Sequence, residues 1–293
     1  MVFTILITCY NKKTYILILK REINNGRKSD IVIIRENFFD AEEYNIENIL
    51  EGKEIKCKPE EIIYFDLEHY VYKKPKCIGV FGACIYDNVD KRIHVTQYMI
   101  ENKSEVVEIL LLAKKYFTKM KNIGKKVIVT FSGNNDFTVI KYLFNKYNIY
   151  FDFDKEFKSL DIQKEYERNM NTSIGLKNLE KAFNIYREGD LISGSNLAKT
   201  FHKVLKDKDY IERMPKEKIE TILLYNEQDV VNLYKIFITW KEYIQIKDEE
   251  TEINIDKEDI KVHNDEININ EITEEDKEEI ETEAEEVQDC IID

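Results

Sequence analysis

The order of apolar segments along the 293 residues predicts an α/β fold, in which a mixed β-sheet carries helices on its faces. Three consecutive segments, 60–70, 78–87 and 92–100, are rich in β-branched and aromatic residues and read as strands. Segments with helical spacing then alternate with a further buried strand at 125–131. Hydrophobic residues make up 43% of the chain, which is enough for a sizeable core.

Residues 1–58 read as a small β-rich extension that precedes the main domain. Short segments rich in Ile, Val and Tyr predict strands at 2–8, 14–20 and 30–35, the first two of which suit a hairpin. The segment 38–52 resembles a short helix that ends at a glycine. No chemical motif falls in this region.

Residues 59–245 hold the predicted α/β domain. The strands at 78–87 and 92–100 flank a polar turn at 87–90, so we expect them to be antiparallel neighbours. Apolar residues at helical spacing predict helices at 104–122, 137–147, 160–170, 175–185, 196–206 and 216–243.

The charge is divided unevenly along the chain. Residues 248–293 carry 21 acids and 3 lysines, a net charge of −18, whereas the remaining 247 residues carry 36 acids and 41 Lys and Arg, a net charge of +5. The whole-chain charge of −13 therefore does not exclude a nucleic-acid partner. Residues 246–293 have few apolar side chains, and we expect a disordered acidic tail.

The cysteines and the apolar runs indicate the setting of the protein. Five scattered cysteines without a Cys-x-x-Cys pair argue against a disulfide framework or a zinc site. The apolar run at 2–8 is too short for a signal sequence, and no run approaches the roughly 18 residues of a membrane helix. We expect a cytoplasmic protein that does not enter a membrane.

Asp66 and Glu68 follow the apolar run Ile-Ile-Tyr-Phe on the first strand of the domain. Residues i and i+2 of a strand point to the same face, so the two carboxylates lie side by side. Such a pair is costly to bury without a cation, and a divalent ion is the natural partner. Acid-x-acid triplets are common in so acidic a chain, so the placement carries more weight than the pattern.

Two further acids occupy suitable positions. Asp136 lies where the buried strand at 125–131 passes through a polar turn into a helix, and a helix cap is the simpler interpretation of it. Tyr225 and Asp229 are four residues apart in the long predicted helix and share one face. Taken alone, Asp229 is equally typical of a solvated acid on an amphipathic helix.

The set, in this order, indicates phosphodiester chemistry, because a pair of divalent ions held by about four carboxylates can activate water and stabilise a leaving oxygen. The sequence resembles the DEDD 3′–5′ exonucleases of the ribonuclease-H-like superfamily, over about residues 61–240. Tyr225, four residues before Asp229, resembles their tyrosine subclass, since the histidine subclass places His at position 224, which is Leu here. The stretch 175–230 is most similar to the bacterial YprB-like branch.

This resemblance implies a role for each of these residues. Asp66, Glu68, Asp136 and Asp229 would hold two Mg²⁺ or Mn²⁺ ions, and Tyr225 would position the attacking water. The family usually has Phe-Asp in its second motif, whereas this chain has Asp136 followed by Phe. That shift turns the side chain by about 100° at a helix start. Asp161 would belong to the shell on the substrate side and not to the ligands.

Three functions remain open from the sequence. The first is a metal-dependent 3′–5′ exonuclease that acts on DNA or RNA ends. The second is a nucleic-acid-binding module that keeps the fold without hydrolysis, for which the shifted second motif is the best support. The third is a regulatory protein whose acidic tail recruits a basic protein partner. Metal binding separates the first function from the other two.

Overall fold

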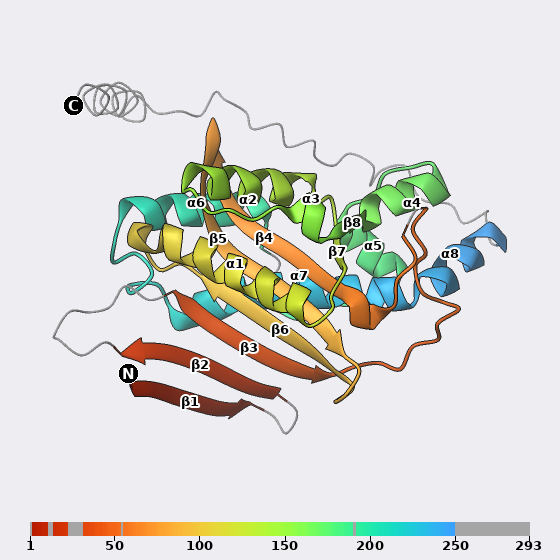
Figure 1. Cartoon of the computed structure of the whole chain (residues 1–293), viewed down its shortest axis with the longest axis horizontal. Helices are drawn as coiled ribbons and strands as arrows, with labels where there is room; N and C mark the ends of the chain where they lie inside the picture. The colour runs from red at the N-terminus through yellow and green to blue at the C-terminus, as the bar shows by residue number, and fades with distance from the viewer. Residues whose placement is uncertain (1, 11–13, 23–31, 54, 190–191, 250–293) are drawn as a thin grey trace. The chain divides into compact units, whose positions relative to one another are not determined.

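The computed structural model of the chain describes residues 2–10, 14–22, 32–53, 55–189 and 192–249 (Figure 1). The predicted tail at 246–293 lies almost wholly outside these residues. The strands are β1 (Val2–Tyr10), β2 (Thr14–Glu22), β3 (Ile33–Asp40), β4 (Ile62–Tyr72), β5 (Lys74–Asp87), β6 (Arg92–Met99), β7 (Val127–Thr130) and β8 (Lys158–Asp161).

All of these strands belong to one mixed sheet, in the order β1-β2-β3-β6-β5-β4-β7-β8. β4 pairs antiparallel with β5 and parallel with β7, and β8 continues the parallel part beyond β7. β5 and β6 are antiparallel neighbours, as their polar turn predicts. The N-terminal strands enter the same sheet because β3 pairs antiparallel with β6.

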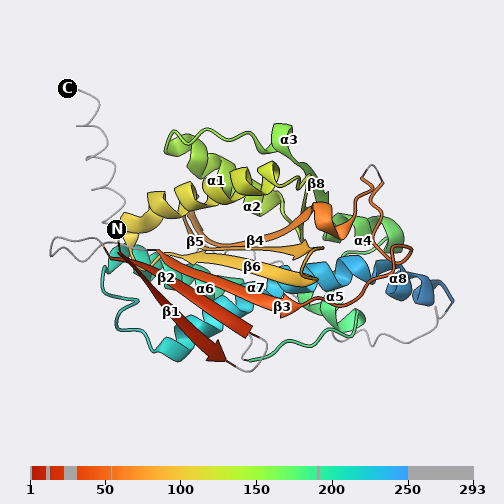
Figure 2. The same cartoon turned by 60° about the horizontal axis from the view of Figure 1, so that its bottom comes forward.

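Helices cover both faces of the sheet. They are α1 (Val106–Asn122), α2 (Asn134–Lys146), α3 (Phe153–Glu156), α4 (Ile162–Met170), α5 (Leu176–Ala182), α6 (Gly194–Lys206), α7 (Lys216–Ile238) and α8 (Trp240–Glu249). Figure 2 shows α1 and α2 on one side of β4 and β5 and α7 on the other. The predicted α/β class, a mixed sheet flanked by helices, is confirmed.

The central strand β4 shows why the sheet needs both layers. Phe65 contacts Phe117 of α1 and Phe137 of α2, whereas Tyr64 contacts Tyr234 of α7. Residues alternate between the faces of a strand, so odd positions of β4 face α1 and α2 and even positions face α7. Asp66 and Glu68 therefore lie on the α7 side.

Two expectations about the elements were wrong. The segment 38–52 is not a helix, because its first residues extend β3 along β6 and its end lies in the core, where the Leu50 amide donates to the carbonyl of Phe237 at 2.8 Å. Tertiary contacts override the helical preference of the segment. The helix expected at 216–243 is divided at Thr239 into α7 and α8. The short elements β8 and α3 were not foreseen.

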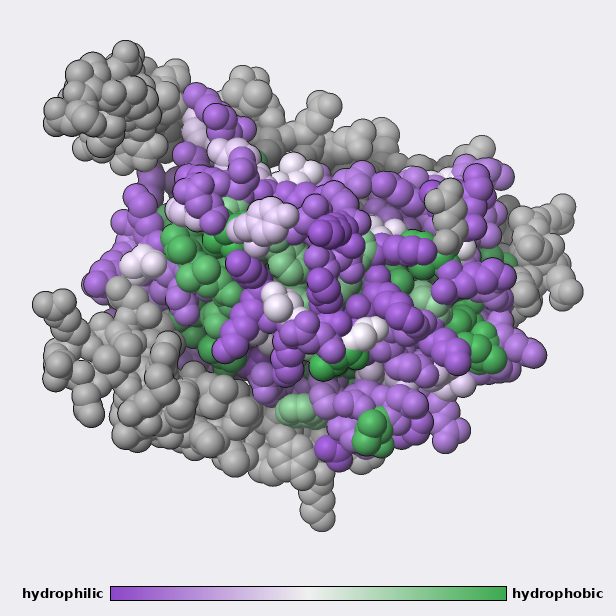
Figure 3. Space-filling model, viewed as in Figure 1, coloured by the Kyte–Doolittle hydropathy of each residue, from purple (hydrophilic) through white to green (hydrophobic). Residues whose placement is uncertain are grey.

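The surface, the helices and the cysteines agree with the features expected of a domain with a polar surface. Polar residues cover most of the described surface seen in Figure 3, and apolar side chains are scattered among them. Within the described part of the chain, no helix combines the length and the apolar character needed to cross a bilayer. Cys57, Cys77 and Cys84 are buried and free, as expected of small core residues.

Candidate metal centre

The centre begins on β4, beyond the point where β7 stops pairing with it. The parallel register joins Ile62 to Val127 and Tyr64 to Val129, so Asp66 and Glu68 come after the paired part of the strand. Glu68 is 8% exposed, and Asp66 is partly buried. The end of a parallel strand is where α/β sheets usually present their ligand sites.

The long helix α7 brings the third acid to the same place. Asp66, Glu68 and Asp229 each offer an oxygen, and the three oxygens lie within 4.8 Å of one another. Oxygens bound to one divalent ion at about 2.0–2.6 Å lie up to about 5 Å apart, so this spacing fits a shared ion. The geometry thus unites residues that are more than 160 positions apart in the sequence.

Burial and mutual repulsion make ionisation of this group difficult. Burial raises the pKa of Asp66 to about 6. Burial, followed by the charge of Asp66, raises the pKa of Glu68 and of Asp229 well above the ordinary carboxyl range. A bound cation would favour the ionised form of these acids and lower their pKa values again. The cluster of desolvated oxygens is therefore a suitable place for a cation.

Tyr225 lies one helical turn before Asp229 on the same face of α7. Its ring is 5.1 Å from both the guanidinium carbon of Arg187 and the ammonium of Lys177. Burial, and then the charges of Asp229 and Glu68, raise the pKa of the Tyr225 phenol, so its hydroxyl stays protonated. The phenol is therefore available as a hydrogen-bond donor beside the carboxylates.

Asp136 lies near the three other acids but outside their close group. It is the third residue of α2, whose N-cap position is held by Gly133, and it is 7% exposed. Burial, and then the charges of Asp66 and Asp229, raise its pKa. The Nε2 of His69 is 3.9 Å from the Asp136 carboxylate, and burial lowers the pKa of this histidine, which favours its neutral form. The simple cap interpretation is therefore not supported.

A buried arginine that the sequence analysis missed neutralises Asp229. Arg187 forms an ion pair with Asp229 and a two-pronged pair with Glu180, whose N···O distances are both 2.7 Å. The Arg187 side chain is only 7% exposed. Asn232 donates a further hydrogen bond of 2.9 Å to Glu180. The arginine lies in the loop after α5, and no local pattern of the sequence marks it.

A second missed contact fixes Asp66. The side-chain amide of Asn226 donates to Asp66 at 2.9 Å and accepts from Gln97 at 2.9 Å. Asn226 and Gln97 are fully buried. The chain leaves room for this amide at Gly82, where an added Cβ would lie 2.0 Å from the Asn226 oxygen. The sequence signal that could have indicated Asn226 is its position directly after Tyr225.

Asp161 has a structural role in the turn beneath Asp136. Its carboxylate accepts from the backbone amides of Ser132, Gly133 and Gln163 at 3.0 to 3.2 Å. It thereby caps α4 and anchors the positive-φ residue Ser132, whose φ is 53°. Its exclusion from the metal ligands stays a prediction.

Fold and site together define a class: an α/β protein whose mixed sheet presents buried carboxylates at the end of a central strand. A family model, RNase_H_2 of the RNase H superfamily, matches residues 63–254. The match covers more than half of the chain, so the protein belongs to the RNase H superfamily. No curated protein and no solved structure matches the sequence.

Membership confirms the ribonuclease-H-like fold that the motifs predicted. Proteins of this fold are commonly nucleases that act on nucleic acids and usually use divalent metal ions. The DEDD type, the YprB-like branch and the roles of individual residues remain predictions.

Proposed function

We propose that the protein is a metal-dependent 3′–5′ exonuclease of the DEDD type that hydrolyses phosphodiester bonds in DNA or RNA. The observation that carries this proposal is the convergence of Asp66, Glu68 and Asp229 within 4.8 Å, with Tyr225 one turn away. Membership of the RNase H superfamily supports a nucleic-acid substrate.

The donor set fits hard divalent ions, because it consists of carboxylate oxygens without sulfur or imidazole in the close group. Asp66, Glu68 and Asp229 would hold one Mg²⁺ or Mn²⁺, and Asp66 with Asp136 would hold a second. Such ions supply an activated water and stabilise the leaving oxygen of a phosphodiester.

The protein's own groups prepare this centre. Asn226 holds the orientation of Asp66 through its 2.9 Å hydrogen bond, and Arg187 holds Asp229. The protonated phenol of Tyr225 can orient a water beside the carboxylates. Because Arg187 offsets part of the negative charge, the acids tolerate close packing before any ion is bound.

Two observations favour the second function, a nucleic-acid-binding module without hydrolysis. Arg187 already supplies a positive charge to Asp229, and Asp136 is not among the three acids that converge most closely. A buried arginine of this kind could stabilise the acidic cluster in a protein that no longer binds a metal ion. Metal affinity therefore decides between the two functions.

The test combines calorimetric titration of the full chain with Mn²⁺ and digestion of labelled oligonucleotides. DNA and RNA strands labelled at the 5′ end should shorten progressively, and strands labelled at the 3′ end should release a mononucleotide first. Asp66→Asn should remove Mn²⁺ binding and cleavage together. Tight oligonucleotide binding without Mn²⁺ binding or cleavage would select the second function.

A further inference from the structure

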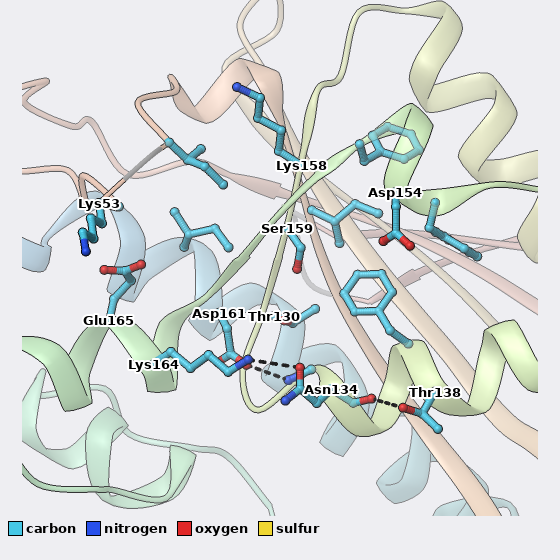
Figure 4. A pocket seen from close by; sticks show the side chains of 18 of the residues that line it. Lys53, Thr130, Asn134, Thr138, Asp154, Lys158, Ser159, Asp161, Lys164 and Glu165 are labelled. Carbon is cyan, nitrogen blue, oxygen red and sulfur yellow. Dashed lines mark hydrogen bonds between the residues drawn. The ribbon is translucent and has the colours of Figure 1, made fainter.

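A hollow of about 690 Å³ lies between α2, α4, the edge strand β8 and the loop that contains Gly52. Figure 4 shows its labelled side chains, with Ser159 between Lys158 at one end and Lys164 and Asn134 at the other. This volume falls within the range of ordinary ligand pockets, roughly 300–1,000 Å³. We call this hollow the β8 trough.

The open edge of the sheet lines the trough. β8 is the last strand in the sheet order, and the Lys158 amide donates to Lys126 on the side of β7. Backbone groups alternate in direction along a strand, so the amide of Ser159 faces away from β7, on the open side. The exposed Ser159 hydroxyl adds a second donor there. Amide and hydroxyl donors of this kind commonly bind phosphate oxygens.

The charges around the trough favour an anion. Five cationic side chains and three acids line it. Each acid is already engaged: Asp154 with Lys141, Glu165 with Arg168, and Asp161 with three backbone amides.

Three lysines remain around the trough: Lys53, Lys158 and Lys164. They are exposed, and no ion pair with an acid is found for them among the residues that the structure describes. Lys164 contacts only a neutral oxygen, that of the Asn134 side chain at 3.1 Å. Asp161 keeps its negative charge, because its partners are neutral amides, so an anionic ligand would meet three lysines against one acid, a net charge of +2.

The trough is joined to the metal centre by a single turn. Gly133 and Asn134 line the trough, and Asp136 lies two residues after Asn134 in the first turn of α2. Asp161, at the end of β8, holds this turn through the amides of Ser132 and Gly133, and its charge raises the pKa of Asp136. A strand whose end lies at the carboxylates would thus find the trough next along its path.

We propose that the β8 trough binds the sugar-phosphate backbone of a single nucleic-acid strand, away from the bond that is cut. Lys53, Lys158 and Lys164 contact its phosphates, and the amide and hydroxyl of Ser159 donate to a phosphate between them. This proposal rests on the proposed function, because it assigns to the trough the same strand whose end lies at the metal centre. The trough would therefore set how strongly binding depends on oligonucleotide length and on salt, and it would not affect the cleavage step itself.

The test compares the full chain with the triple variant Lys53→Ala, Lys158→Ala, Lys164→Ala. Fluorescence anisotropy in EDTA measures the affinity for a labelled single strand without cleavage, over a salt series. Each phosphate contact on a single strand contributes about 0.7 to the slope of log affinity against log salt. We expect the triple variant to bind about 10- to 100-fold more weakly at low salt, and its slope to fall by up to about 2.

The matched control replaces three exposed lysines that do not line the trough, Lys103, Lys115 and Lys199. This control should retain most of the affinity and slope. A chromogenic mononucleotide, the p-nitrophenyl ester of thymidine 5′-phosphate, does not extend into the trough. With Mn²⁺, both triple variants should cleave it at the rate of the parent.

The outcomes separate the two proposals. Equal affinity and equal slope for the parent and the trough variant would overturn the trough assignment. Failure of the parent to bind Mn²⁺ or cleave the ester would reject the proposed nuclease, while the anisotropy arm would still report on strand binding. Competition by a hexaglutamate peptide as strong as that of a strand with equal charge would assign the trough to acidic peptides instead.

Discussion

Arg187 forms a buried ion pair with Asp229, and no comparable cation contacts Asp66 among the described residues. The two acids share one close cluster but differ in what balances their charge. Asp229 is in direct contact with a guanidinium, which Glu180 also binds, whereas Asp66 accepts a hydrogen bond from the neutral amide of Asn226 and interacts with the Arg187 charge only at a distance. Substitution of the two acids should therefore have opposite effects on stability.

The first prediction concerns these substitutions without metal. Asp66→Asn removes a carboxylate whose pKa burial raises to about 6, so at pH 8 it should stabilise the protein by up to about 3 kcal/mol. The pKa of Asp229 is raised as well, but Asp229→Ala leaves the buried Arg187 with Glu180 as its remaining acid, and this loss should outweigh the relief and cost about 1–3 kcal/mol. Melting curves in EDTA measure both changes, and both variants should lose nuclease activity. Equal destabilisation by both would refute the contrast.

The second prediction concerns pH. Asp66, Glu68 and Asp229 have folded-state pKa values above those of the unfolded chain, so the folded state binds more protons. The stability that they contribute is complete below about pH 4 and is lost as the pH rises through about 6 and beyond. In EDTA, Asp66→Asn should flatten the fall in melting temperature between pH 5 and pH 8. Saturating Mn²⁺ should raise the melting temperature more at pH 8 than at pH 5.

The third prediction separates the hydroxyl of Tyr225 from its ring. Tyr225→Phe keeps the ring that stacks with Arg187 and Lys177, so Mn²⁺ affinity and melting temperature should change little. If the hydroxyl orients the attacking water, the cleavage rate should fall by about 10²-fold. Tyr186→Phe is the control, because Tyr186 is 81% exposed. An unchanged rate in Tyr225→Phe would remove the phenol from the mechanism.

The fourth prediction tests the support that Asn226 gives to Asp66 on the α7 face of the sheet. In Gly82→Ala, the new Cβ would lie 2.0 Å from the Asn226 oxygen, so Asn226 must move and release Asp66. We expect a loss of about 1–3 kcal/mol in stability, together with weaker Mn²⁺ binding. Gly194→Ala is the matched control, because an added Cβ meets nothing within 4 Å there. Normal Mn²⁺ affinity in Gly82→Ala would show that Asn226 does not position the ligand.

The fifth prediction concerns the acidic segment after α8. Truncation after Glu249 removes 19 acids and 3 lysines, a net charge of −16, and leaves residues 1–249 with a net charge of +3. If this segment competes with phosphates, the truncated protein should bind oligonucleotides more tightly at low salt, and the difference should shrink as salt rises. Identical binding at every salt concentration would leave the segment a role in solubility or in recruiting a protein partner.

The sequence predicted the elements and the acids because those signals are local. Alternation along β4 places Asp66 and Glu68 on one face, and helical spacing places Tyr225 one turn before Asp229. The segment 38–52 shows the limit of such patterns. Its residues have helical spacing, but pairing with β6 and burial against α7 stabilise the extended conformation more than helix formation would. Short elements such as β8 carry too few residues to show a period at all.

What the sequence determined by itself is the set of acids, the face that each presents on its own strand or helix, and the superfamily to which they point. Only the tertiary structure decided that Arg187 reaches Asp229, that Asn226 reaches Asp66, and that Asp136 lies outside the closest group. The physical reason is range. Backbone geometry fixes the direction of a side chain relative to residues within about four positions. Contacts between residues 42 or 160 positions apart depend on how loops and layers pack, which no local period records.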